Sequence, residues 1–144
     1  MISLFSSIFT GHYIFSRYVS SPKIDMRGNA NFKSHSHHLK HYHEEGSYIW
    51  EGNEQAFYQH QLFVIHENQL SIFKSAGDLL HKFNLTKKRG FPIHLNHMHQ
   101  CNNDQYILDF WIQSHDRLFT FYRVLGPNKD YSITTHFSRT SLAK

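Results

Sequence analysis

The sequence predicts an all-β fold: a closed, antiparallel, up-and-down barrel of about ten strands with a short N-terminal helix. From residue 12 onward, aromatic and β-branched side chains alternate with polar ones in short segments, as they do in half-buried strands. The breaks between these segments are short turns, and such brief connections join only antiparallel neighbours. A meander of this many strands removes its free edges by meeting itself, which favours a barrel over a sandwich.

The elements follow one another without a repeat or a linker. Apolar residues at roughly helical spacing over 2–9, followed by Gly11, predict a short amphipathic helix that plugs one end of the barrel. The predicted strands span 12–19, 27–35, 38–50, 55–67, 69–75, 78–86, 92–101, 104–114, 117–125 and 130–139. The turn signals between them include Ser21-Pro22, Glu51-Gly52-Asn53, Ala76-Gly77, Asn102-Asn103, His115-Asp116 and Gly126-Pro127-Asn128. We therefore expect a single domain over residues 1–144, with a helical segment at 1–10.

Composition narrows the class of protein. The 144 residues suffice for one core, and the net charge of +4 comes from basic residues scattered outside the run Lys87–Arg89. Without a basic stripe interleaved with exposed aromatics, nucleic-acid binding is not expected. The single cysteine, Cys101, excludes an intramolecular disulfide. The N-terminal apolar run is too short to span a bilayer and lacks the features of a secretory signal. We expect a cytoplasmic monomer or homodimer without a cofactor or metal.

The hairpin around Asn102-Asn103 carries the clearest functional signal. Asn tolerates the positive φ that a two-residue turn requires, so the turn sets the register: Cys101 faces Asp104, and His99 faces Tyr106. Residues two apart share a face. One face therefore carries Ile93, Leu95, His97, His99, Cys101, Asp104, Tyr106, Leu108, Phe110 and Ile112. We expect this face to be interior, apolar at its far end and polar near the turn, as in a cavity with a hydrogen-bonding rim.

The same parity argument assigns inner faces to three other strands. If His115-Asp116 is a two-residue turn, the inner face of 117–125 carries Phe119, Phe121, Arg123 and Leu125. Arg123 would then lie among aromatic side chains. The inner face of 78–86 carries Leu79, His81, Phe83 and Leu85. The inner face of 27–35 carries Gly28, Ala30 and Phe32, whose small members would leave room in the barrel. The strands at 38–50 and 55–67 do not settle their own parity.

Five motifs occur in order along the chain. They are GHYIFSR at 11–17, YHEEG at 42–46, HKF at 81–83, HQCNNDQY at 99–106 and GPNKDY at 126–131. This combination resembles a family of small uncharacterised proteins, a domain of unknown function with a lipocalin-like barrel. Its pattern reads G-x-W-x-L-x-R, Y-x-E-x-G, F-H-x-F, H-x-C-x-x-D-x-Y and G-P-R-K-D-Y. The resemblance spans residues 11–139 and implies a lipocalin-like (calycin-type) fold with no established activity.

The resemblance also implies a set of candidate site residues. They are Arg17, Tyr42, Glu44, His81, His99, Cys101, Asp104, Tyr106, Lys129, Asp130 and Tyr131. The sequence departs from the family pattern at Tyr13, Leu80 and Asn128, where relatives have Trp, Phe and Arg. At His60-Gln61 relatives tend to have an aromatic residue followed by Arg, so a shared contact with an anion is not expected there.

Two functional hypotheses follow from the interior face. In the first, the lumen holds a small, largely apolar or aromatic molecule bearing an oxygen or carboxylate. The ligand-binding residues are then Arg17, Tyr42, Glu44, His81, His99, Cys101, Tyr106 and Arg123. In the second, the cavity serves a small acid-base enzyme of isomerase, cyclase or dehydratase type, with Asp104 orienting His99 and Tyr106 donating to the substrate. A barrel filled by its own side chains would instead be a protein-interaction scaffold.

Structural alternatives stand beside these roles. Buried polar groups must be paired, so the polar side chains near the turn would otherwise satisfy one another and close the barrel mouth. Arg17 inside a barrel requires either a carboxylate, such as that of Glu44, or an anionic ligand. The H-x-H pair of His97 and His99 places two imidazoles on one face, but 14 histidines make such pairs expected by chance. An interior cysteine is more often a packing residue than a nucleophile.

Overall fold

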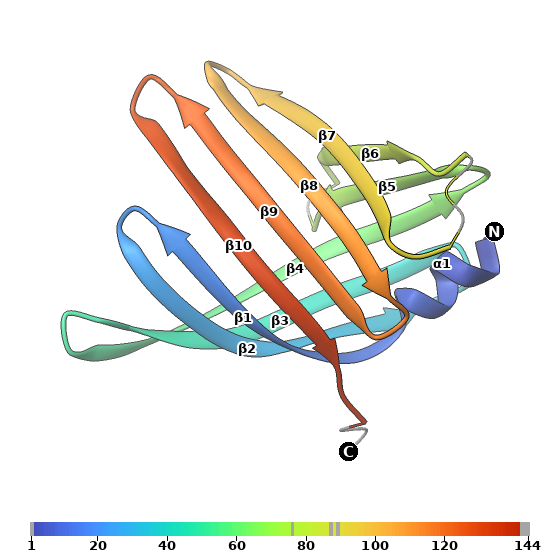
Figure 1. Cartoon of the computed structure of the whole chain (residues 1–144), viewed down its shortest axis with the longest axis horizontal. Coiled ribbons are helices and arrows are strands. Elements are labelled where there is room, and N and C mark those ends of the chain that lie inside the picture. Colours follow the sequence, from blue (N-terminus) through green and yellow to red (C-terminus); the bar gives the residue numbers. More distant parts are fainter. Residues whose placement is uncertain (1, 76, 87, 89, 142–144) are drawn as a thin grey trace.

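The computed structural model describes residues 2–75, 77–86, 88 and 90–141, and within them it contains one helix and ten strands (Figure 1). The helix is α1 (Ile2–Ile8). The strands are β1 (Gly11–Ser20), β2 (Lys23–Ser34), β3 (Leu39–Trp50), β4 (Asn53–His66), β5 (Gln69–Lys74), β6 (Leu79–Asn84), β7 (Ile93–Cys101), β8 (Asp104–Ser114), β9 (Arg117–Gly126) and β10 (Lys129–Arg139). The all-β prediction is confirmed. Ala76 of one expected turn, and Lys87 and Arg89 of the basic run, lie outside the described residues.

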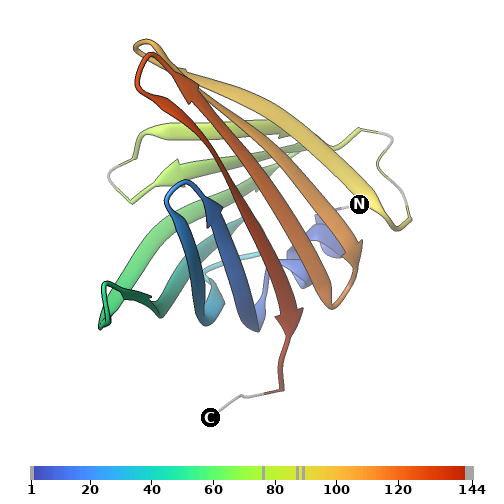
Figure 2. The same ribbon diagram turned by 60° about the vertical axis from the view of Figure 1, so that its left-hand side comes forward.

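All the strands belong to one antiparallel sheet in the order β6-β5-β4-β3-β2-β1-β10-β9-β8-β7. Neighbouring strands of the sheet are also consecutive in the sequence, except that β1 pairs with β10. This ladder runs from Tyr13 opposite Arg139 to Val19 opposite Ile133. The sheet curls on itself (Figures 1 and 2). The predicted up-and-down barrel is therefore confirmed, but it is nearly rather than fully closed, because no ladder in the described chain joins β6 to β7.

The β7–β8 hairpin has the register that its turn predicts. Asn102 adopts a φ of 56°, Cys101 lies opposite Asp104, and the pairing runs unbroken to Ile93 opposite Ile112. The far end of the predicted interior face is buried, through Ile93, Leu95, Leu108, Phe110 and Ile112. The turn end differs from the expectation, because Cys101 is exposed.

The inner face predicted for β9 is wrong. Ile112 pairs with Leu118 while Ser114 pairs with Arg117, so Gln113 is an extra residue on β8. A bulge of one residue reverses which side chains of the following strand face the core. Leu118, Thr120, Tyr122 and Val124 therefore face inward. The Arg123 side chain is 49% exposed and pairs with Asp130 at 3.2 Å, so Arg123 lies outside the barrel.

The other parity assignments hold with two exceptions. On β6, His81 and Phe83 are buried as predicted, as is Leu85 just beyond the strand, but Leu79 is exposed. On β2, Ala30 and Phe32 are buried. Gly28 leaves no free room, because a Cβ atom there would lie 2.6 Å from Cζ of Phe15. The missing side chain of Gly28 instead admits the Phe15 ring.

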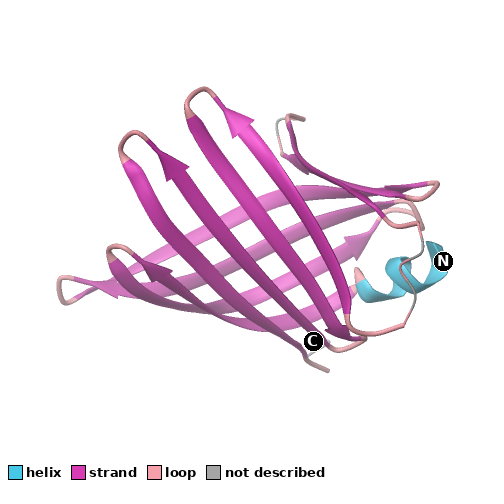
Figure 3. Cartoon of the chain, turned by 45° about the horizontal axis from the view of Figure 1, so that its top comes forward, coloured by secondary structure: helices cyan, strands magenta, loops and turns pink. Residues whose placement is uncertain are grey.

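Helix α1 closes one end of the barrel, as the sequence predicts (Figure 3). Its Phe5 and Ile8 side chains and the adjoining Phe9 are fully buried. The ring centroid of Phe9 lies 5.4, 5.3 and 5.9 Å from those of Phe32, Phe63 and Phe110, so one ring joins the helix to both halves of the sheet. Among the residues that the structure describes, no helix has the length and apolarity needed to cross a membrane.

Polar contacts hold this helix in place. The buried Lys40 ammonium donates to the hydroxyls of Ser6 (2.8 Å), Thr10 (3.2 Å) and Ser34 (2.6 Å), and burial lowers the pKa of Lys40. Arg139 on β10 donates to the carbonyl of Thr10 at 2.6 Å, which satisfies an acceptor just beyond the helix C-terminus. The helix and the turn that follows it are thus tied to β3 and β10 by hydrogen bonds as well as by packing.

Candidate functional site

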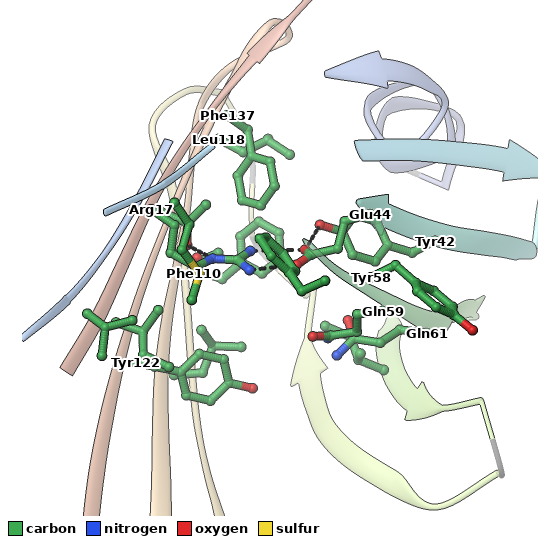
Figure 4. Close-up of a pocket in the computed structure, with 18 of the residues that line it drawn as sticks. Arg17, Tyr42, Glu44, Tyr58, Gln59, Gln61, Phe110, Leu118, Tyr122 and Phe137 are labelled. Atoms are coloured by element: carbon green, nitrogen blue, oxygen red, sulfur yellow. Dashed lines mark hydrogen bonds and ion pairs between the residues drawn. The ribbon is translucent and has the colours of Figure 1, made fainter. Parts of the chain in front are cut away.

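A cavity of about 420 Å³ lies inside the barrel (Figure 4). Its wall is mostly apolar and includes rings from β2, β4, β8 and β10, namely Phe32, Phe57, Phe63, Phe110 and Phe137. A polar cluster from β1 and β3 interrupts this wall. A largely apolar hollow of this size with a few convergent polar groups is typical of small-molecule sites.

The polar cluster is built on Arg17 and Glu44. Alternation along β1 and β3 directs both side chains inward. Arg17 contacts the two Glu44 carboxylate oxygens through Nη1 at 2.5 Å and Nη2 at 2.9 Å. Its Nε donates to Thr135 Oγ1 at 2.8 Å, and the Tyr42 hydroxyl donates to Glu44 Oε1 at 2.5 Å. The ion pair that the sequence analysis names as one alternative for Arg17 is therefore present.

Electrostatics keep this cluster in one protonation state. Burial alone would lower the pKa of Arg17, but the hydrogen bonds and charge of Glu44 raise it on balance. Burial, together with the adjacent Glu44 carboxylate, raises the pKa of Tyr42 well above its ordinary value. Arg17 is thus a cation and Tyr42 a neutral donor at physiological pH. The guanidinium also lies 4.7 Å from the ring centroid of Phe15.

Tyr122 brings a second polar group to the cavity and connects it to two histidines. Its hydroxyl hydrogen-bonds Nε2 of the buried His81, whose Nδ1 lies 2.9 Å from Nδ1 of His97. Burial, with smaller contributions from His97 and His99, lowers the pKa of His81 to about 3. Burial also raises the pKa of Tyr122. The His81–His97 contact bridges β6 and β7, between which the described chain has no ladder. The series of contacts from Tyr122 through His81 to His97 therefore links the cavity to this gap in the sheet.

Thr120, Tyr122 and Thr135 also line the cavity, although the sequence pattern did not predict them as site residues. The first two lie on β9, whose faces are exchanged by the bulge at Gln113. One signal for the correct parity exists in the sequence. Placing the charged Arg123 outward, where it needs no buried partner, turns Thr120 and Tyr122 inward.

At the turn end of β7 and β8, the motif at 99–106 meets the motif at 126–131. Asp104 accepts from Lys129 at 2.9 Å, and the same ammonium donates to the Tyr106 hydroxyl at 3.0 Å. These hydrogen bonds, first from Tyr106 and then from Asp104, raise the pKa of Lys129. Gly126 packs against this cluster: a Cβ atom there would lie 2.0 Å from Asp104 Oδ1, so a larger residue would have to displace the Asp104 carboxylate. The cluster fixes the β7–β8 hairpin against the turn between β9 and β10.

The structure divides the predicted site residues into separate groups. Three of them line the cavity: Arg17, Tyr42 and Glu44. His81 reaches it through Tyr122. Four lie toward the turn end of β7–β8, outside the lining of that cavity: His99, Cys101, Asp104 and Tyr106. Asp104 pairs with Lys129, and no hydrogen bond between His99 and Asp104 occurs in the described chain.

Metal binding has no support from side-chain geometry. In the part of the chain that the structure describes, no group of three or more His, Cys, Asp or Glu side chains is arranged to hold an ion. His81 and His97 are close, but the ring centroid of His99 lies 6.2 Å from that of His81.

Solved structures share this fold. The S-type phycobiliprotein lyase CPES from Guillardia theta matches with a TM-score of 0.70 and 8% identity, over 97% of this chain and 93% of that one. A de novo designed fluorescence-activating β-barrel matches with a TM-score of 0.53 and 9% identity, over 94% and 96%. The redesigned barrel mFAP1, bound to DFHBI, matches with a TM-score of 0.53 and 7% identity, over 93% and 97%. At these identities, the likeness establishes the fold alone.

Sequence comparison places the chain more narrowly. No curated protein has significant similarity to it. A model of a protein family of unknown function matches residues 9–139, a span that includes the motifs meeting at the Arg17–Glu44 pair and at Lys129. The chain belongs to this family, the family of unknown function DUF6314.

Proposed function

We propose that the barrel binds a small, largely apolar or aromatic molecule in its lumen. The observation that carries this proposal is the cavity of about 420 Å³, walled by aromatic rings and with a fixed polar cluster at Arg17, Tyr42 and Glu44. The described residues include 22 buried hydrophobic side chains, and a ligand in the hollow beside them would gain dispersion contacts with the apolar wall. The similar fold of mFAP1, a barrel bound to DFHBI, supports a lumenal ligand.

The lining supports a planar ligand with one polar end. Phe110 and Phe137 present rings on which an aromatic molecule can pack, and Tyr122 offers a hydroxyl from β9, the strand between theirs (Figure 4). Such a ligand would be held by apolar contact and oriented by hydrogen bonds.

An entry route follows from the lengths of the strands. β4 begins at Asn53, but β5 pairs with it only from Gln61 to His66. Along one edge of the segment 53–60, no strand of the described chain is paired. Tyr58 and Gln59 of this segment belong to the cavity lining, and Tyr58 is 71% exposed. The cavity therefore communicates with solvent beside this edge of β4.

Nile red, a neutral dye that fluoresces in apolar surroundings, tests the proposal. We expect it to bind the wild type, and Thr120→Trp, which fills the lumen from β9, to weaken binding at least tenfold. Phe121→Trp on the opposite face of the same strand is the matched control and should bind as the wild type does. Circular dichroism verifies folding, and Thr120→Phe replaces the larger variant if it unfolds. Absence of dye binding to the wild type, or equal binding by both variants, contradicts the proposal.

A further inference from the structure

We propose that the cavity selects neutral ligands over anionic ones, and that it favours planar aromatic molecules bearing an amide-like group. This inference rests on the proposed function and specifies the chemical class of its ligand. It departs from the expectation, drawn from the sequence, that Arg17 is available to a ligand carboxylate.

The cavity has no net formal charge. Of the described residues that line it, only Arg17 and Glu44 carry charges, and they neutralise each other. All three nitrogens of the Arg17 guanidinium are engaged, Nη1 and Nη2 by Glu44 and Nε by Thr135. These contacts use three of the five guanidinium N–H groups, so a ligand anion could reach only the other two, directly beside the Glu44 carboxylate, which is 2% exposed.

The Glu44 carboxylate is also held from its other side. Tyr42 donates to Oε1, so this oxygen accepts two hydrogen bonds and the carboxylate is fixed in a packed wall. An anionic ligand placed against that wall would face a buried negative charge with its own cation already paired. Repulsion from this charge and loss of hydration both disfavour the anion.

Uncharged polar groups remain available beside the pair. Gln59 and Gln61 project from β4 toward the cavity (Figure 4). Neither side-chain amide has a hydrogen-bond partner among the described residues. A carboxamide donates through its nitrogen and accepts through its oxygen. Two such groups at one wall therefore complement a ligand amide, lactam or urea, which needs an acceptor and a donor at the same place.

A matched pair of probes tests this selectivity. 2-Naphthamide and 2-naphthoate have nearly the same shape and differ in charge at neutral pH. Displacing Nile red from the wild type, the amide is expected to bind at least tenfold more tightly than the carboxylate. Glu44→Gln removes the internal counter-ion of Arg17 and should raise naphthoate affinity at least tenfold. Glu45→Gln is the matched control, because this neighbouring carboxylate is 68% exposed on the outer face, and it should behave as the wild type.

A second variant, outside the ion pair, keeps the inference testable even if Glu44→Gln does not fold. Gln61→Leu should weaken 2-naphthamide severalfold more than it weakens Nile red, because only the amide probe needs both a donor and an acceptor at this wall. If naphthoate competes with dye as well as or better than naphthamide on the wild type, or if Gln61→Leu leaves the amide unaffected, this inference is overturned while the proposed lumenal binding stands. If Nile red does not bind at all, the proposed function itself fails.

Discussion

Acidification should destabilise the fold through His81. The ordinary pKa of histidine is 6.5, and burial, with smaller contributions from His97 and His99, lowers that of His81 to about 3. Between these values the unfolded chain binds a proton that the folded chain does not, so stability is present above pH 6.5 and is lost as pH falls. Lowering the pH from 6.5 to 5 crosses about 1.5 pH units of this window. At about 1.4 kcal/mol per unit, the free energy of unfolding falls by about 2 kcal/mol.

Urea unfolding followed by circular dichroism at pH 7, 6 and 5 measures this contribution. His81→Gln should be less stable than the wild type at pH 7, because it removes the contacts to Tyr122 and His97. The difference between the two proteins should then shrink by about 2 kcal/mol at pH 5. His66→Gln, at an exposed histidine, is the control and should follow the wild type. Parallel stability curves for the wild type and His81→Gln would refute a depressed pKa at His81.

Two further predictions concern the motif contacts. Arg17→Met should lower the free energy of unfolding by about 3–5 kcal/mol, because it leaves the Glu44 carboxylate buried and unpaired. The double variant Arg17→Met/Glu44→Gln should recover most of this loss. Urea unfolding measures both, and equal midpoints for the two variants would contradict the prediction. Gly126→Ala should lower the free energy of unfolding by about 1–3 kcal/mol, because its Cβ would lie 2.0 Å from Asp104 Oδ1. A double-mutant cycle with Asp104→Ala should show strong coupling between the two positions. Additive effects would exclude the clash.

Much of the fold follows from the sequence because short turns propagate register. The turn at Asn102-Asn103 determines every pair of β7 and β8, from Cys101 opposite Asp104 outward. The same reasoning fails at β9. The extra residue at Gln113 of β8 exchanges the inward and outward faces of β9, and the alternation of residues along β8 does not reveal it. A turn therefore fixes which side chains face inward only as far as the first bulge along the strand.

The ion pair of the candidate site could be predicted from the sequence, because a buried charge needs a partner of opposite charge. Arg17 inside a barrel requires a carboxylate, and Glu44 supplies it. Contacts between distant strands were not predictable from local pattern. The pairing of Asp104 with Lys129, rather than with His99, depends on how the turn between β9 and β10 approaches β8. Lys40 was likewise missed, because its strand does not settle its own parity and its three hydroxyl partners come from α1, the following turn and β2.

The ladder between β1 and β10 has a consequence for the order of folding. It is the place where a meander of six strands joins a meander of four, and its first pair, Tyr13 with Arg139, encloses nearly the entire chain. Each meander can zip locally from its own hairpins, whereas this ladder must close the longest loop in the molecule. Assembly should therefore proceed as two preformed curved sheets that dock along one line, with the lumen created only at that final event.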